Sequence, residues 1–349
     1  MELSQTPYCL ERFHEKIAQR RRCDILARTL GRQYEIWRNV SLPFDVYPLP
    51  DTPCRRGIIL AGGAGSRLAP MTRAINKHLL PVYDKPLIYY PLTTLMMVGI
   101  RDILIISSED GISNLKRLCG DGSQWGLRIE YATQDGANGI AEALLIGEQF
   151  IAGEPFALIL GDNVFYGHGM LETLLRAAAH AKHGAGILTY NVATPEDYGV
   201  LTVNSEGRAV GLVEKPTNPS SNQAVTGLYF YCAEAVAMTH ELQPSTRGEL
   251  EITDLNRCFM EEQRLYYEEI GRGSVWFDAG TAESLFAAGA YIEIIQNRQS
   301  IGVAFPEEVA LRFGYIDVDG FRSAVNILPD CRYRIFLEAV LREILNEVS

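Results

Sequence analysis

The chain has 349 residues, of which 47% are hydrophobic and 21% charged, the composition of a globular protein with a large core. Its formal net charge is -11, which argues against nucleic-acid binding, because such binding depends on Lys and Arg side chains that neutralise phosphates. A small phosphorylated ligand is compatible with this charge, since a few local cations suffice to hold it.

Local patterns exclude further classes of protein. The cysteines are scattered and never spaced as CxxC, which argues against a disulfide framework or a zinc site. The N-terminal stretch MELSQTPYCLERFHEKIAQRRR lacks the apolar core of a secretory signal. The most apolar stretch, PLIYYPLTTLMMVGI, contains Pro91 and is too short to span a bilayer. We therefore expect a cytoplasmic protein that binds neither membrane nor nucleic acid.

Residues 1–55 form an N-terminal extension with a pattern of its own. Apolar residues at near-helical spacing predict a helix from Glu11 to Asn39, and the four prolines of SLPFDVYPLPDTPCRR predict a linker. The basic cluster Arg20–Arg22 favours a solvated helix face over a nucleic-acid or partner site. The sequence leaves the function of this extension open.

From Gly57 onward, short apolar runs alternate with amphipathic segments. Strands buried on both faces are predicted at GIIL, DILIIS, PFALIL and GILTYNV, and a helix at MLETLLRAAAHAKH. This alternation predicts an α/β fold with a Rossmann-like, mostly parallel sheet flanked by helices. The segments VLTV, NSEG and RAVGLVE predict an antiparallel hairpin inserted into that order.

The stretch GIILAGGAGSR ends a predicted strand in a turn of small residues. Gly62, Gly63 and Gly65 let the backbone approach a ligand and point N–H groups into one anion-binding concavity. Taken alone, the loop is equally well explained as a tight turn, since it matches neither the Walker A nor the dinucleotide pattern. Arg67 and Lys77 follow, and both suit a polyphosphate, although surface cations are the commoner fate of either residue type.

Two acids follow apolar runs at positions suited to a metal. Asp162 lies at the expected carboxyl end of a strand, where ligands of open α/β sheets bind, and Asp278 follows SVWF. Mg²⁺ prefers one or two carboxylates together with phosphate oxygens. Singly, each acid is better explained as the cap of a helix or turn, but beside a phosphate loop the pair favours a metal site.

A second group of charged residues suits a sugar phosphate. Glu214 and Lys215 lie at a strand end, where lysine suits a phosphate and glutamate accepts hydrogen bonds from hydroxyls. Arg247 in RGELEITD offers a further phosphate contact. A surface ion pair and an ordinary helix N-terminus are the alternative interpretations. No HxH, HExxH or GxSxG pattern occurs, so hydrolytic and zinc chemistry have no support.

Together these motifs resemble those of the glucose-1-phosphate thymidylyltransferases, in the sugar nucleotidyltransferase superfamily. They occur in the order and spacing of that family from about Arg56 to beyond PEEVALRFGYI, which is nearly all of the chain after the extension. The matching motifs are LAGGAGSRL, NKHLLPVYDKPLIYYPL, LGDNVFYGH, YGV, EKP, AVTGLYFY, RGELEITD and WFDAGT.

The resemblance implies transfer of a thymidylyl group from dTTP to α-D-glucose 1-phosphate with Mg²⁺, giving dTDP-glucose and pyrophosphate by in-line attack. It also implies a homotetramer with a feedback nucleotide-sugar site between subunits. We accordingly expect a nucleotidyltransferase catalytic domain over residues 56–300 and a helical C-terminal region over residues 301–349 packed on it. The implied catalytic residues are Arg67, Lys77, Asp162 and Lys215. The implied binding residues are Gly62, Gly63, Gly65, Gln134 and Gly139 for the nucleotide, Gly199, Glu214, Lys215, Val225, Tyr229 and Arg247 for the sugar phosphate, and Asp162 and Asp278 for the metal.

Several positions depart from the usual family motifs SKQLLP, SPDGLAQA and DTGT. The departures are Asn76 and His78 in the first motif, Ala137, Asn138 and Glu142 in the second, and Ala279 in the third. They leave open the same reaction with UTP, since uracil and thymine differ by one methyl group, or with another sugar 1-phosphate. A nucleotide-binding homologue without catalysis is a further alternative, against which the retained cations and acids argue.

Overall fold

The computed structural model describes residues 49–348 except Ala64 and Ala137. The helix predicted at Glu11–Asn39 and the first half of the proline-rich linker, residues 41–48, lie outside the described residues. Where the chain is described, no helix is long and apolar enough to cross a membrane.

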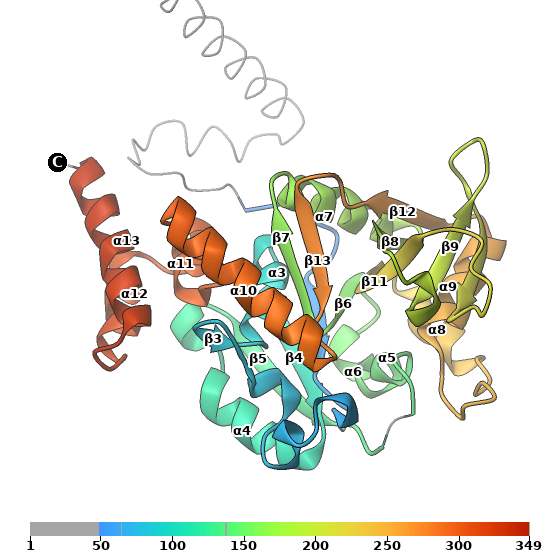
Figure 1. Cartoon of the computed structure of the whole chain (residues 1–349), viewed down its shortest axis with the longest axis horizontal. Coiled ribbons are helices and arrows are strands. Elements are labelled where there is room, and N and C mark those ends of the chain that lie inside the picture. The colour runs from blue at the N-terminus through green and yellow to red at the C-terminus, as the bar shows by residue number, and fades with distance from the viewer. Residues whose placement is uncertain (1–48, 64, 137, 349) are drawn as a thin grey trace, which may run out of the picture.

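A nine-stranded sheet forms the centre of the described chain (Figure 1). Its order is β10-β9-β11-β6-β1-β4-β5, with β8 and β12 continuing from β11. Its strands are β1 (Arg56–Leu60), β4 (Asp102–Ser107), β5 (Arg128–Thr133), β6 (Phe156–Leu160), β8 (Ala185–Asn191), β9 (Gly199–Val203), β10 (Ala209–Glu214), β11 (Gln223–Tyr231) and β12 (Leu265–Glu269). The pairings run every strand of this sheet except β10 and β11 in one direction, which confirms the predicted mostly parallel sheet.

Helices cover both faces of this sheet, while α10 packs on the small strands β2 and β13, and α12 and α13 pack on α11. The helices are α3 (Tyr89–Met97), α4 (Glu109–Cys119), α5 (Glu142–Ile146), α6 (Glu148–Ile151), α7 (Met170–Ala179), α8 (Glu234–His240), α9 (Ile252–Glu261), α10 (Ala282–Gln299), α11 (Pro306–Arg312), α12 (Val318–Asn326) and α13 (Arg332–Val348). Successive residues of a strand point to opposite faces. In β4, Ile103 and Ile105 therefore join a core cluster with α3, α4 and α7, while Leu104 and Ile106 join one with α5, α8 and α9.

The predicted hairpin is present as β9 and β10, joined by a turn in which the backbone N–H of Asn204 donates to the carbonyl of Arg208 at 2.9 Å. Two small sheets stand apart from the central one. Strands β2 (Pro81–Val82) and β3 (Lys85–Pro86) form one, and β7 (Asn163–Gly167) and β13 (Ser274–Asp278) form the other. The second pair matters for the site, because its register sets Asp278 opposite Asn163.

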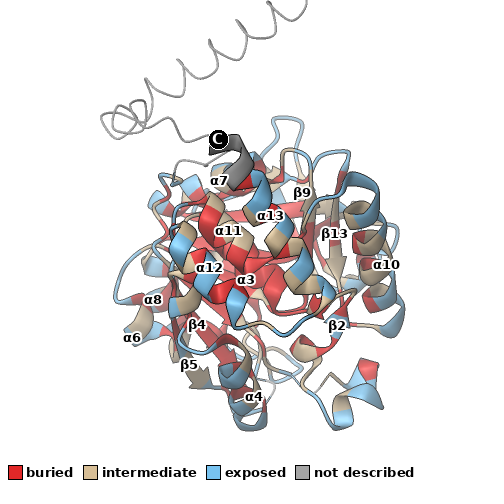
Figure 2. Cartoon of the chain, turned by 90° about the vertical axis from the view of Figure 1, so that its left-hand side faces the viewer, coloured by how far each residue is buried: buried red, intermediate tan, exposed pale blue. Residues whose placement is uncertain are grey.

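The C-terminal helices pack on the rest of the molecule through buried polar contacts as well as apolar ones. Figure 2 shows α11, α12 and α13 over α3 on one side of the molecule. Glu307 on α11, 5% exposed, accepts hydrogen bonds from Trp125 Nε1 at 3.1 Å and from Tyr333 Oη at 2.6 Å. The buried ammonium of Lys85 pairs with Asp84 and lies 4.1 Å from the ring centroid of Phe305.

We expect Glu307→Ala to lower the free energy of unfolding by about 2–4 kcal/mol, because it leaves two buried donors, on Trp125 and Tyr333, without an acceptor. Urea denaturation followed by circular dichroism measures this change. The matched control is Asp319→Ala on α12, whose exposed carboxylate pairs only with Arg322 and should cost less than about 1 kcal/mol. Equal effects of the two substitutions would contradict the prediction.

Candidate active site

The site begins where two adjacent parallel strands end. Leu60 of β1 pairs in register with Leu160 of β6, so the segments that follow both strands leave the sheet at the same edge. This carboxyl edge is where open α/β sheets bind their ligands. The glycine loop leaves it with Gly63 at φ 87° and Gly65 at φ 59°, in the left-handed region that glycine adopts without strain.

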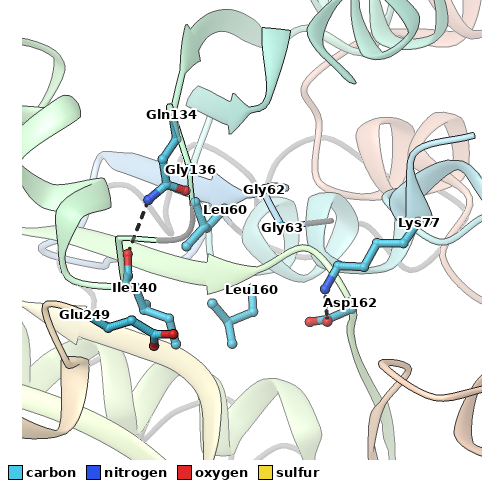
Figure 3. A pocket seen from close by; sticks show the side chains of 11 residues that line it. Leu60, Gly62, Gly63, Lys77, Gln134, Gly136, Ile140, Leu160, Asp162 and Glu249 are labelled. Carbon is cyan, nitrogen blue, oxygen red and sulfur yellow. Dashed lines mark hydrogen bonds and ion pairs between the residues drawn. The ribbon is translucent and has the colours of Figure 1, made fainter. Parts of the chain in front are cut away.

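A pocket of about 220 Å³ opens at this edge (Figure 3). Six residues implied by the resemblance line it, and they come from four separate parts of the chain. These are Gly62, Gly63, Lys77, Gln134, Gly139 and Asp162. In Figure 3, Lys77 and Asp162 point toward one another, and Gln134 and Glu249 lie at the opposite side of the pocket. The predicted nucleotide-binding residues are thus brought together, except that Gly65 and Arg67 lie outside this pocket.

Gly65 and Arg67 lie close to the pocket residues. A Cβ atom on Gly65 would stand 3.4 Å from Cβ of Lys77. The guanidinium of Arg67 lies beside Gly280. A Cβ atom on Gly280 would stand 2.7 Å from Nη2 of Arg67 and 2.9 Å from Oδ1 of Asp278. Arg67 therefore lies near the second predicted acid.

The two predicted metal ligands are neighbours. Asp162, 6% exposed, accepts a hydrogen bond from Lys77 Nζ at 2.6 Å, and its carbonyl accepts one from the N–H of Ala279 at 2.9 Å. Strand β13 ends in Asp278, directly beside Ala279. Neither carboxylate caps the helix that follows it, because the N-caps of α7 and α10 are Gly169 and Thr281. Asp278 does accept a backbone hydrogen bond from Gly280, which agrees with the turn-capping alternative for this residue.

The pKa values of the two carboxylates are shifted in opposite directions. Burial raises the pKa of Asp278 to about 6 and the charge of Asp162 adds to the rise, while Arg67 and Lys77 oppose it. Burial also acts to raise the pKa of Asp162, but the charge and hydrogen bond of Lys77 outweigh it and hold that pKa below its usual range. Two buried acids that destabilise each other's charge form a site that a cation would relieve.

The loop from Gln134 to Glu142 forms one wall of the pocket. The side-chain amide nitrogen of Gln134 donates to the carbonyl of Gly139 at 3.2 Å and to Oε2 of Glu142 at 2.7 Å. Gly139 has φ 104° and lies against the backbone of Leu250, where a Cβ atom would stand 2.2 Å from the carbonyl oxygen. Only glycine therefore fits at this position. The loop packs here directly against the segment that contains Glu249 and Leu250.

The predicted sugar-phosphate residues gather around Gly199. A Cβ atom on Gly199 would stand 3.3 Å from Oε2 of Glu214 and 4.0 Å from Cβ of Val225. Thr253 donates a hydrogen bond to the same Glu214 oxygen at 2.5 Å. Tyr229 is buried, which raises its pKa, and the nearby charge of Glu214 adds to that rise.

Two cations accompany this group. The ammonium of Lys215 is half exposed and stands 3.9 Å from Oε1 of Glu214. Arg247 donates to both carboxylate oxygens of Glu251 at 2.8 Å and stands 3.8 Å from Glu214 and 3.5 Å from Glu249. Because Glu249 lines the pocket and Glu214 belongs to the Gly199 group, Arg247 stands close to both.

Sequence reasoning missed several residues of the site. Glu249 lines the pocket, and its position in the motif RGELEITD beside Arg247 is the signal that could have indicated it. Leu60 and Leu160 are apolar lining residues that the ends of the two predicted strands could have indicated. Asn163 holds the site together: its Oδ1 accepts from the N–H of Gly227 at 2.9 Å and from Trp276 Nε1 at 2.6 Å. No pattern in the sequence predicts that Asn163 joins Gly227 and Trp276.

Comparison with known proteins identifies the family of this chain. Residues 56–294 match the family described as nucleotidyl transferase. A glucose-1-phosphate thymidylyltransferase of Xanthomonas campestris pv. campestris is 52% identical over 288 residues, covering 82% of this chain and 97% of its own. One of Mycobacterium tuberculosis is 49% identical over 286 residues, covering 82% of this chain and 99% of its own.

Solved structures show the same likeness. A Bacillus anthracis protein assigned as a glucose-1-phosphate thymidylyltransferase is 38% identical with a TM-score of 0.64, and the match covers 72% of this chain and 98% of that one. A UDP-glucose pyrophosphorylase complexed with UDP-glucose is 27% identical with a TM-score of 0.61, covering 69% and 99%. The chain therefore belongs to the nucleotidyl transferase family, and within it to the glucose-1-phosphate thymidylyltransferases.

Proposed function

We propose that this protein transfers the thymidylyl group of dTTP to α-D-glucose 1-phosphate and releases pyrophosphate. The observation that supports this most is the pocket at the carboxyl edge of the sheet, where the glycine loop, Lys77 and Asp162 face the Gln134 loop. Relatives that are named for this activity share about 50% sequence identity with the chain and align over nearly their whole length.

In this proposal the nucleotide lies along the glycine loop. Backbone N–H groups of Gly62, Gly63 and Gly65 donate to its phosphates, and Gln134 and Gly139 contact the base. Arg67 and Lys77 neutralise the triphosphate and then the charge that develops on the departing pyrophosphate. Fixed cations and donors of this kind act without reorganising during the reaction, which is why they lower its barrier.

Asp162 and Asp278 suit a magnesium ion as carboxylate ligands. The fit rests on their adjacency, since the N–H of Ala279 next to Asp278 donates to the carbonyl of Asp162, and on the pKa of Asp278, which burial raises and the charge of Asp162 raises further. Among the described residues no cluster of three or more His, Cys, Asp or Glu side chains forms a metal site, so the remaining ligands would be phosphate and water oxygens, as Mg²⁺ prefers. The ion would supply charge neutralisation at the phosphates.

The Gly199 group would hold the sugar phosphate. Glu214 accepts hydrogen bonds from sugar hydroxyls, Lys215 and Arg247 contact the phosphate, and Val225 and Tyr229 line the sugar. A phosphate oxygen of the sugar 1-phosphate attacks the α-phosphorus, the bond to the bridging oxygen of the β-phosphate breaks, and pyrophosphate leaves. The residues contribute by holding both reactants in line, which converts an encounter of two molecules into a reaction within one complex.

We further propose that residues 56–300 are the catalytic domain, with residues 301–349 packed on it, and that the protein is a cytoplasmic homotetramer with a feedback site between subunits. All proposed site residues lie within the first range. Two large apolar side chains of α10, Phe286 and Ile294, are 78% and 54% exposed, which supports a subunit contact on that helix. The proposal of a feedback site rests on the family resemblance alone.

The direct test measures pyrophosphate release by the purified protein with Mg²⁺, glucose 1-phosphate and each of dTTP, UTP, CTP, ATP and GTP. We expect release with dTTP, a smaller rate with UTP, and loss of release on chelation with EDTA that added Mg²⁺ restores. Preference for ATP or GTP would contradict the thymidylyl assignment. Absence of pyrophosphate release with every nucleotide, and with other sugar 1-phosphates, would favour a non-catalytic homologue.

Asp162→Asn should lower kcat at least about 10³-fold, because the amide keeps the shape of the side chain but removes its charge and its ability to bind Mg²⁺ tightly. Steady-state pyrophosphate release measures the effect. Asp102→Asn is the matched control, since Asp102 begins strand β4, lies outside the site and, among the described residues, pairs with the exposed Arg128. A rate near that of the unmodified protein for Asp162→Asn would overturn the metal assignment.

Arg247→Ala should raise the KM for glucose 1-phosphate about 30-fold, since it removes a cation from the proposed phosphate position. The KM for dTTP should change less than about threefold. Arg257→Ala on α9 serves as the control, because Arg257 is bound to Asp254 at 2.7 Å and has no proposed contact with substrate. The KM for each substrate is measured separately. A larger rise in the KM for dTTP than in the KM for glucose 1-phosphate would contradict the proposed contact of Arg247 with the sugar phosphate.

A further inference from the structure

The carboxylate of Glu142 bridges two side chains of the loop that walls the pocket. Its Oε2 accepts from the side-chain amide nitrogen of Gln134 at 2.7 Å, and its Oε1 accepts from that of Asn138 at 2.9 Å. Asn138 also donates to the carbonyl of Asp135 at 2.8 Å. Glu142 opens helix α5, so the bridge ties the loop to a regular element.

These contacts fix which end of the Gln134 amide faces the pocket. Both partners of its nitrogen, the carbonyl of Gly139 and the carboxylate of Glu142, are acceptors, and an ionised carboxylate has no proton to donate. The reverse orientation would set an oxygen against two oxygens. The amide oxygen is therefore directed the other way, where a Cβ atom on Gly62 would stand 2.9 Å from it. Figure 3 shows this oxygen on the side of the glycine loop.

An acceptor that faces the base position distinguishes classes of pyrimidine. Thymine and uracil carry an N–H group at N3, which donates to an acceptor. Cytosine carries an unprotonated N3, which is itself an acceptor and would be set against the Gln134 oxygen. A buried polar pair of that kind loses a hydrogen bond and keeps the cost of removing both groups from water. Gln134 is 7% exposed, so water is not freely available to compensate.

We propose that Glu142 is a positioning residue that sets nucleotide specificity: by accepting from the amide nitrogen of Gln134 it holds the amide oxygen toward the base and selects nucleotides with an N3–H group over cytidine nucleotides. The inference rests on the proposed function, because it takes the base to lie against Gln134. It makes no distinction between thymine and uracil, since both carry the same N3–H group.

The test compares the unmodified protein with Glu142→Ala, Glu142→Leu and Glu142→Gln in steady-state assays with dTTP, UTP and CTP. The Ala and Leu variants lack the acceptor, and Leu keeps most of the side-chain volume in case Ala perturbs folding. We expect the ratio of kcat/KM for dTTP to that for CTP to fall about tenfold or more in both. The loss should be the same for UTP as for dTTP and should appear mainly in KM, while Glu142→Gln, which can still accept, recovers most of it.

Glu130→Gln is the matched control, because Glu130 lies on β5, the strand that leads into the same loop, and its side chain is half exposed. It should leave all three nucleotides unchanged. A dTTP-to-CTP ratio within twofold of the unmodified protein in both the Ala and Leu variants would overturn the inference, as would a loss for dTTP that UTP does not share.

Calorimetric binding of dTDP and dCDP separates this inference from the proposed function. Absence of turnover with dTTP would overturn the proposed reaction, and the inference would still require tighter binding of dTDP than of dCDP, reduced by Glu142→Leu. Equal binding of the two nucleotides by the unmodified protein would overturn the inference whatever the turnover.

Discussion

The site depends on the pairing of β7 with β13, which brings two carboxylates into one buried place. That pairing joins the segment after β6 to a strand more than a hundred residues later, and its register sets Asp278 beside the Asp162–Asn163 step. Two acids so placed repel one another, and the positions of Lys77 and Arg67 offset part of that repulsion. Because the cations come from the segment after β1, the acid pair also fixes where the glycine loop lies.

The side-chain amide of Asn163 links this arrangement to the central sheet. Asn163 donates to Asp162 at 3.0 Å and accepts from Gly227 of β11 and from Trp276 of β13. The side chain thus joins three strands that belong to two different sheets. Its polar atoms are satisfied although it is 1% exposed, as is required of a buried amide. The acids are held in place by a backbone and side-chain network rather than by the apolar core alone.

Much of the fold followed from local sequence. The strands at GIIL, DILIIS, PFALIL and GILTYNV and the hairpin after Gly199 are present, because apolar runs and turn residues are local signals. The family resemblance implied six of the residues that line the pocket. Contacts such as Glu307 with Trp125, or Asn163 with Trp276, could not be predicted, since they join residues more than a hundred positions apart and leave no periodicity in either segment.

The packing of α11 has a consequence for where this enzyme can be divided. The family match ends at residue 294, but the fold does not end there. Lys85 lies over Phe305, and Trp125 and Tyr89 lie in the same core cluster as Ala310 and Phe313 of α11 and the turn after it. An expression fragment that ends at the family boundary would therefore expose an apolar face to water and would remove Phe305 from Lys85. The useful minimal unit of this protein extends through α13.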